Sequence, residues 1–192
     1  MSIKKVAVLF SGSGSNLQAI LEKVHGKEFN GVKIEVSLLI SNNPNAYGIK
    51  RAKEFGLETK VIDHTKFISR ESFDKMIVEE IKKANIDLTV LAGFMRILTP
   101  IFTEQIRAIN LHPSILPLFK GGHAITDSYA SKMMLGGVSV HYVSSELDGG
   151  KIIKQRAFER KKGMSFEEWE TTIHTIEHEI LPETIVEILT TN

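Results

Sequence analysis

The sequence predicts an α/β fold, in which a mostly parallel, twisted sheet carries helices on both faces and ends in an antiparallel hairpin. Two observations carry this prediction. In the first half of the chain, short apolar runs alternate with segments whose apolar residues recur at helical spacing. After residue 138 the pattern changes to a half-buried alternation, then a Gly-Gly pair at 149–150 and a second strand-like run.

The predicted elements of the first half follow one another regularly. Apolar runs predict strands at 6–10, 34–40, 59–62 and 86–92. Helical spacing of apolar residues predicts one helix after the first strand, a second that stops at Gly56, and a third that ends near Ala84. Thr99-Pro100 is typical of an N-cap followed by proline in the first turn, so we expect a further helix there.

The second half departs from this alternation. An apolar run at 106–111 predicts a strand, and we expect a helix from Ile125 to Leu135. Strands at 138–143 and 152–158 then form the hairpin, because the two glycines between them favour a tight turn. Ser165-Phe-Glu-Glu168 is a capping box, which predicts the start of the last helix.

Composition excludes several classes of protein. The chain is 42% hydrophobic and 24% charged with a net charge of +1, and no basic block favours nucleic acid as a partner. No apolar stretch reaches the roughly 20 residues that span a bilayer, and the start does not resemble a secretion signal. We therefore expect a cytoplasmic protein. The absence of cysteine excludes disulfides, a thiol nucleophile and thiolate metal ligands.

Asn110 and His112 are the strongest candidates for chemistry. They stand where the 106–111 strand ends before Pro113, and residues two apart on a strand point to the same face. Asp148 follows later, at the expected turn of the hairpin. An amide donor, a titratable ring and a carboxylate that orients the ring can stabilise an oxyanion and move a proton. The alternative is a turn-capping asparagine beside an interior histidine with ordinary hydrogen bonds.

A loop rich in glycine and serine joins the first strand to the first helix, with the sequence Ser11-Gly-Ser-Gly-Ser-Asn16. Free N–H groups and the positive end of the helix dipole make such a junction an anion site. Leu17 replaces the third glycine of a dinucleotide fingerprint, and no acidic residue ends the second strand. In this Rossmann-like arrangement the loop fits a single phosphate better than a dinucleotide. A glycine turn without a ligand is the alternative.

Four sequence blocks together resemble the phosphoribosylglycinamide formyltransferases, the folate-dependent transformylases of purine biosynthesis. The likeness runs from Val6 to about Ile188 and implies the formyltransferase fold. Lys120 departs from it, since many members of the family have proline before the following glycine. The blocks are Gly12-x-Gly14-Ser15-Asn16-Leu17, Leu91-Ala-Gly-Phe-Met-Arg96-Ile-Leu98, Asn110-x-His112-Pro113-Ser114-x-Leu116-Pro117 and Glu146-Leu147-Asp148-Gly149-Gly150.

The resemblance implies direct formyl transfer from 10-formyltetrahydrofolate, as co-substrate, to the amine of glycinamide ribonucleotide, without a metal. Asn110, His112 and Asp148 would be catalytic, with Asp148 holding the ring of His112 and favouring its protonated form. Glu177 would face the substrate amine. The implied ribonucleotide contacts are Gly14, Ser15, Asn16, Pro113 and Glu177, and the implied folate contacts are Arg70, Met95, Arg96, Ile97, Leu98, Asn110, Val143 and Leu147.

The resemblance also implies an organisation. Residues 1–192 are expected to form one formyltransferase domain, with a phosphate-binding half at 1–100 and a catalytic and folate-binding half at 101–192. The expected partners are the two small molecules, without nucleic acid or membrane, and a second copy of the chain as a possible homodimer.

Other readings of the same residues stay open. Formyltetrahydrofolate hydrolases and methionyl-tRNA formyltransferases share the Asn/His/Asp set, but each normally adds a domain that we do not expect in 192 residues. A non-catalytic phosphate sensor would explain the glycine loop and leave that set without a purpose. His174-x-x-Glu177-His178 also fits a zinc peptidase pattern. Helical spacing puts both histidines on the solvated side and Glu177 at the edge of the apolar face, so we expect no metal.

Overall fold

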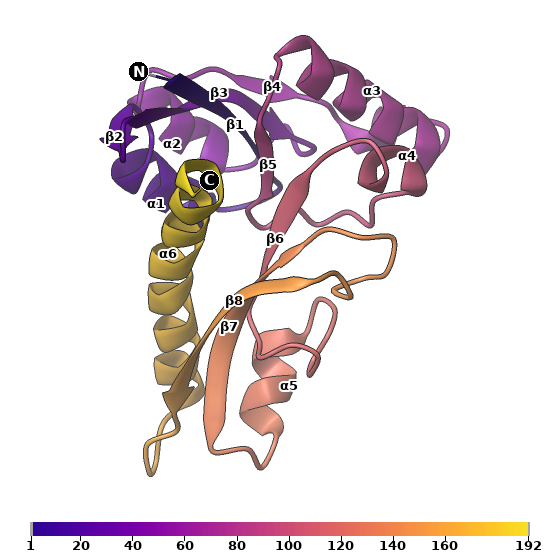
Figure 1. The fold of residues 1–192 in the computed structure, drawn as a ribbon. Helices are drawn as coiled ribbons and strands as arrows, with labels where there is room; N and C mark the ends of the chain where they lie inside the picture. The colour runs from indigo at the N-terminus through magenta and orange to yellow at the C-terminus, as the bar shows by residue number, and fades with distance from the viewer. Residues whose placement is uncertain (1, 192) are drawn as a thin grey trace.

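The computed structural model describes residues 2–191 and is drawn in Figure 1. Its strands are β1 (Ser2–Phe10), β2 (Lys27–Phe29), β3 (Val32–Ser41), β4 (Thr59–Val61), β5 (Leu88–Leu91), β6 (Ala108–His112), β7 (Leu135–Tyr142) and β8 (Ile152–Glu159). They form an eight-stranded sheet in the order β2-β3-β1-β5-β6-β7-β8, with β4 also paired to β3. The pairs of β1, β3, β4, β5 and β6 are parallel, and β7 and β8 form an antiparallel hairpin. The predicted fold class is confirmed.

Helices cover both faces of this sheet (Figure 1). They are α1 (Ser15–Lys23), α2 (Gly48–Glu54), α3 (Arg70–Lys83), α4 (Pro100–Thr103), α5 (Ala124–Ala130) and α6 (Phe166–Thr190), with a short 3-10 turn at His64–Lys66. The alternation of β1 divides the core, because Val6, Val8 and Phe10 pack with α1 and α6 while Ala7 and Leu9 pack with α3 and α4. No helix of the described residues is long and apolar enough to cross a membrane.

Three local predictions need correction. The helix expected from Ile125 to Leu135 ends at Ala130, and Leu135 already begins β7. Ser131 ends the helix because its hydroxyl bonds to the backbone, donating to the Ser128 carbonyl and accepting from the Met133 N–H. The short β2, which pairs antiparallel with β3, was not predicted. Thr99 precedes α4 as expected, but its side chain makes no capping hydrogen bond.

The strand order reverses between β1 and β5, which are neighbours in the sheet. After β1 the chain crosses to β3 on one side, and it later returns to β5 on the other. Ligands of open α/β sheets bind in the crevice that such a reversal leaves at the carboxyl ends of the strands. Here the two flanking loops touch, since the Ser11 N–H donates to the Gly93 carbonyl at 3.1 Å.

Candidate active site

The loop between β1 and α1 has a geometry that only glycine fits well at one position. Gly14 is the N-cap of α1 with φ of 72°, in the left-handed region, and no side chain caps the start of the helix. A Cβ on Gly14 would lie 2.5 Å from the Cα of Gly48 in α2. The loop therefore keeps the uncapped N–H groups of α1 facing an open space, where they can bind an anion.

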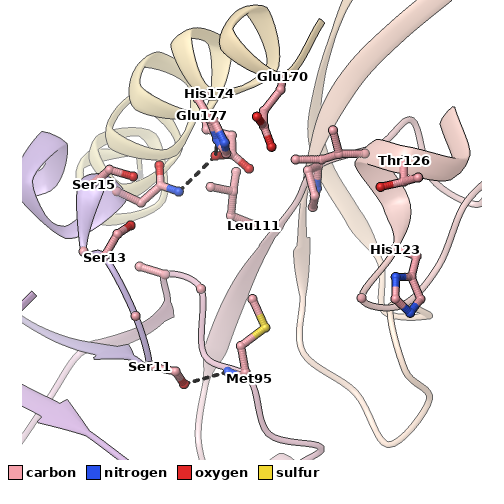
Figure 2. Close-up of a pocket in the computed structure, with 18 of the residues that line it drawn as sticks. Ser11, Ser13, Ser15, Met95, Leu111, His123, Thr126, Glu170, His174 and Glu177 are labelled. Atoms are coloured by element: carbon pink, nitrogen blue, oxygen red, sulfur yellow. Dashed lines mark hydrogen bonds and ion pairs between the residues drawn. The ribbon is translucent and has the colours of Figure 1, made fainter. Parts of the chain in front are cut away.

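That space is a cavity of about 440 Å³, which we call the anion pocket. Figure 2 shows the loop serines on one side, α6 with Glu170, His174 and Glu177 above, and His123 and Thr126 opposite. The described residues that line it are Ser11, Gly12, Ser13, Gly14, Ser15, Asn16, Ala92, Gly93, Met95, Leu111, Pro113, Gly122, His123, Ile125, Thr126, Phe166, Glu170, His174 and Glu177.

Glu177 is a buried carboxylate in this pocket, with 5% of its surface exposed. Its Oε2 accepts from Asn16 Nδ2 at 3.1 Å and from His174 Nδ1 at 2.9 Å. The hydrogen bond to Glu177 raises the pKa of His174, although burial of the ring opposes the change. The His174 side chain is 45% exposed, as expected for the solvated side of the helix, but its ring also turns toward Glu177 and lines the pocket. Oδ1 of Asn16 is buried, has no hydrogen-bond partner among residues 2–191, and can act as an acceptor.

A second cavity of about 350 Å³, the apolar pocket, lies between the segment after β5 and the segment after β7. Of the predicted folate contacts, Arg70 alone is not among its lining residues; Arg70 is the exposed first residue of α3. The lining residues are Leu91, Gly93, Phe94, Met95, Arg96, Ile97, Leu98, Asn110, Leu111, His112, Pro113, Gly121, Gly122, His141, Val143, Ser144, Ser145, Glu146, Leu147 and Asp148.

The structure brings Asn110, His112 and Asp148 together in the apolar pocket. His112 Nδ1 lies 3.4 Å from Asp148 Oδ2, and Asn110 Nδ2 lies 3.4 Å from Asp148 Oδ1. His112 Nε2 lies 2.8 Å from the carbonyl oxygen of Phe119. A carbonyl oxygen only accepts, so Nε2 carries a proton and Nδ1 is the ring nitrogen that faces the carboxylate.

Asp148 is held in place by the backbone around it. Its φ of 49° lies in the left-handed region, which aspartate tolerates better than most residues. The Gly121 N–H donates to its Oδ2 at 2.8 Å, and a Cβ on Gly150 would lie 1.7 Å from the Tyr142 carbonyl oxygen. Burial acts to raise the pKa of Asp148, but the His141 ring, the Gly121 N–H and the His112 ring together hold it below its usual value. Asp148 is therefore a carboxylate at neutral pH.

The two pockets meet. Gly93, Met95, Leu111, Pro113 and Gly122 line both of them, so these residues form a shared wall. Asn110 and His112 line the apolar pocket and are sequence neighbours of Leu111 and Pro113 in this wall. Both pockets also draw residues from both halves of the sequence.

His141 belongs to the same cluster, although sequence reasoning left it outside the catalytic set. It stands opposite Asn110 in the β6–β7 ladder, and its Nε2 lies 3.2 Å from Asn110 Nδ2. Its Nδ1 lies 2.9 Å from the Tyr142 carbonyl oxygen, and its Nε2 also lies 3.7 Å from Asp148 Oδ1. The alternating sequence of β7 predicts which face of the strand carries His141. It does not predict that His141 lies opposite Asn110, which follows from the β6–β7 register.

The chain is an α/β transferase in which the anion pocket lies beside the cluster of Asn110, His112 and Asp148. The chain belongs to the formyl transferase family, whose family model matches residues 4–185.

Individual relatives agree with this assignment. The chain is 38% identical over 179 residues to phosphoribosylglycinamide formyltransferase of Escherichia coli, covering 92% of this chain and 83% of that protein. The crystal structure of phosphoribosylglycinamide formyltransferase from Campylobacter jejuni superposes with a TM-score of 0.95 at 58% identity, covering 97% of this chain and 98% of that one. The human trifunctional purine biosynthetic protein adenosine-3 is 36% identical over 180 residues, which are 93% of this chain and 18% of that protein.

Proposed function

We propose that the chain transfers the formyl group of 10-formyltetrahydrofolate to the amine of glycinamide ribonucleotide, which gives formylglycinamide ribonucleotide and tetrahydrofolate. The observation that carries the proposal is the shared wall between a polar anion pocket and an apolar pocket, next to Asn110, His112 and Asp148. Similarity to phosphoribosylglycinamide formyltransferases over more than nine tenths of the chain supports the choice of substrates.

The ribonucleotide occupies the anion pocket in this proposal. Its phosphate binds at the start of α1, where Gly14, Ser15 and Asn16 offer N–H groups at the positive end of the helix dipole. Glu177 is hydrogen-bonded to Asn16 and comes from α6, on the side of Asn16 away from the loop. Its carboxylate can accept hydrogen bonds from the ribose hydroxyls. This placement favours a ribose contact for Glu177 over the contact with the amine that the resemblance implied. Pro113, in the shared wall, then lies beside the glycinamide end.

The folate occupies the apolar pocket. Ile97, Leu98, Val143 and Leu147 offer apolar contacts to a flat pterin ring, and the backbone of the 95–98 segment supplies polar groups at its edge. Met95, in the shared wall, then lies beside the carbon to be transferred. Arg96 contributes through its backbone, and Arg70 at the start of α3 is assigned to the glutamate tail beyond the pocket.

Proximity supplies much of the rate in this reaction. Two substrates held at the shared wall convert a bimolecular encounter into an attack within one complex. The amine nitrogen bonds to the formyl carbon, and the carbonyl electrons move to oxygen. The oxyanion then re-forms the carbonyl as the bond from carbon to N10 of the folate breaks. The amine loses one proton and N10 gains one, so the exchange is balanced.

The cluster provides the charges and protons for these steps. The contact between Asn110 Nδ2 and Asp148 Oδ1 is long at 3.4 Å, so the formyl oxygen can replace the carboxylate as an acceptor. A protonated His112 places positive charge beside the oxyanion, and Asp148 stabilises that protonated ring. Asp148 is ionised, so it can accept the proton that leaves the amine, directly or through a water molecule.

One assay tests the proposal against its nearest rival. Tetrahydrofolate formation from 10-formyltetrahydrofolate is measured with glycinamide ribonucleotide, without it, and with the riboside that lacks the phosphate. At low substrate concentration we expect turnover with the ribonucleotide and none with the riboside, because the phosphate contributes binding energy at the start of α1. Without either compound we expect no turnover. Equal turnover without any ribonucleotide would identify a hydrolase. Binding of the ribonucleotide without any turnover would instead support a sensor.

A further inference from the structure

We propose that the Ser11 hydroxyl is a positioning group that couples ligand binding in the anion pocket to ligand binding in the apolar pocket. Ser11 directly follows β1 and lines the anion pocket. The inference rests on the proposed function, because it takes the ligands of the two pockets to be the two substrates.

Every polar group of Ser11 is bonded to another segment. Its hydroxyl donates to Asn42 Oδ1 at 2.6 Å. The same hydroxyl accepts from the Met95 N–H at 2.8 Å (Figure 2). Its N–H donates to the Gly93 carbonyl at 3.1 Å, and its carbonyl accepts from Asn43 Nδ2 at 3.2 Å. One residue thus ties together the segments that follow β1, β3 and β5.

The acceptor of the hydroxyl proton is itself fixed. Asn42 is buried, with 3% of its surface exposed, and its amide nitrogen lies 3.1 Å from His64 Nδ1. Because Asn42 cannot turn freely, the Ser11 hydroxyl has one favoured orientation, in which its lone pairs face the Met95 N–H. Through these two hydrogen bonds, the buried Asn42 after β3 fixes the Ser11 hydroxyl, and the hydroxyl fixes the backbone of Met95 after β5.

Met95 links the Ser11 hydroxyl to both ligands, because it lines both pockets. It lies in the shared wall, and 74% of its surface is exposed, so few packing contacts hold it. The Met95 N–H donates a hydrogen bond to the Ser11 hydroxyl. Met95 is also the first residue of the 95–98 segment, which lines the apolar pocket. An anion bound at Gly14 and Asn16 restrains the loop that contains Ser11 and thereby restrains Met95. A folate then meets a segment that is already ordered, and binds more tightly.

Such coupling is reciprocal, so the folate must raise affinity for the ribonucleotide by the same factor. Two hydrogen bonds of ordinary strength connect the segments, and together they support a coupling of roughly threefold to tenfold. Removal of the hydroxyl breaks both bonds, and in the lining of the anion pocket it removes that one hydroxyl, which is already bonded to Asn42 and Met95.

The test measures tetrahydrofolate binding by calorimetry with and without saturating glycinamide ribonucleotide, and ribonucleotide binding with and without tetrahydrofolate. We expect the wild-type Kd of each ligand to fall severalfold when the other is present. In Ser11→Ala both binary Kd values should change by less than about threefold, while the coupling factor falls to about one. Ser11→Thr keeps the hydroxyl and should restore the coupling.

Ser13→Ala is the matched control, because Ser13 lies in the same loop and makes no side-chain hydrogen bond to Met95. This variant should keep the wild-type coupling factor. A wild-type coupling factor of one overturns the proposal without any variant, and so does full coupling in a folded Ser11→Ala protein. Failure of either ligand to bind the wild type at all would instead contradict the proposed function.

Discussion

His112 Nδ1 lies 3.4 Å from Asp148 Oδ2, and the two side chains are 5% and 6% exposed. His112 Nε2 is hydrogen-bonded to the Phe119 carbonyl oxygen, and this bond fixes the ring with Nδ1 toward the carboxylate. A neutral ring in this orientation would point an Nδ1 lone pair at the carboxylate, whereas a protonated ring donates to it. The carboxylate thus faces Nδ1 of the ring, and we expect the two residues to act as one unit.

His112→Ala should lower kcat by about 10²-fold or more, the usual scale for a lost acid/base group. Asp148→Asn should bind folate normally and lose most turnover, because an amide neither stabilises a charged ring nor accepts the amine proton. Since the residues share one task, the double variant should be little slower than the slower single variant. Single-turnover kinetics of the four proteins measure this. A folded His112→Ala protein with near-normal kcat would falsify the assignment and direct attention to His141.

Asn110→Ala should remove the amide donor to the oxyanion and raise the barrier by roughly 3 kcal/mol. The cost falls on kcat and not on folate affinity, because the Asn110 amide bonds to His141 and Asp148 until the oxyanion forms. Steady-state kinetics together with the Kd of tetrahydrofolate separate the two effects. If the variant loses affinity and keeps kcat, Asn110 is a binding residue only.

Gly14→Ala should weaken ribonucleotide binding more than Gly12→Ala. Residue 14 has a positive φ, and its Cβ would lie 2.5 Å from the Gly48 backbone, whereas a Cβ at residue 12 would meet nothing within 4 Å. We expect KM for the ribonucleotide to rise tenfold or more in Gly14→Ala and to stay within about threefold in Gly12→Ala. Equal KM values in the two variants would show that the loop does not bind the phosphate.

Asn16→Ala tests the same site through a side chain. It should raise KM for the ribonucleotide with little change in kcat, because a phosphate contact is made equally in the ground state and the transition state. The bond from Asn16 to Glu177 is lost as well, so the free protein should also lose thermal stability. A large fall in kcat at unchanged KM would move Asn16 from binding to chemistry.

The residues of the candidate site could be proposed from the sequence because they are concentrated in short motifs. Asn110 and His112 share a strand face, and Gly14 needs the freedom of glycine whatever the surrounding fold. Glu177, at the edge of the apolar face of its helix, also reaches a pocket as the spacing predicted. The roles of these residues, the single domain with its two halves, the cytoplasmic location and the homodimer stay predictions.

Contacts across the sheet could not be read from the sequence. His141 meets Asn110 through the β6–β7 register, and Ser11 meets Met95 because β1 and β5 are neighbours. Both facts depend on strand order, which motifs do not encode. The place of His174 in the pocket lining was missed for a related reason, since helical spacing shows the apolar face of α6 but not which loop lies beside its polar edge.

His174 should give ribonucleotide binding a pH dependence. Its pKa is raised by the hydrogen bond to Glu177, with burial opposing. The ion pair is therefore complete below the ordinary histidine pKa of about 6.5, and it is lost as pH rises through the raised value. A protonated His174 keeps its ion pair with Glu177, whose carboxylate we propose to contact the ribose. We expect KM for the ribonucleotide to rise with pH through this range, by less than about fivefold because the ring is half-exposed.

His174→Gln should make KM nearly independent of pH over that range, since glutamine donates a hydrogen bond to Glu177 at every pH. His178→Gln is the matched control, one turn further along α6 and outside the anion pocket lining. Burial lowers the pKa of His178, so this ring is neutral where His174 titrates, and the variant should keep the wild-type pH profile. KM measured from about pH 5.5 to 9 distinguishes the two. An unchanged profile in His174→Gln would remove the pair of His174 and Glu177 as the cause.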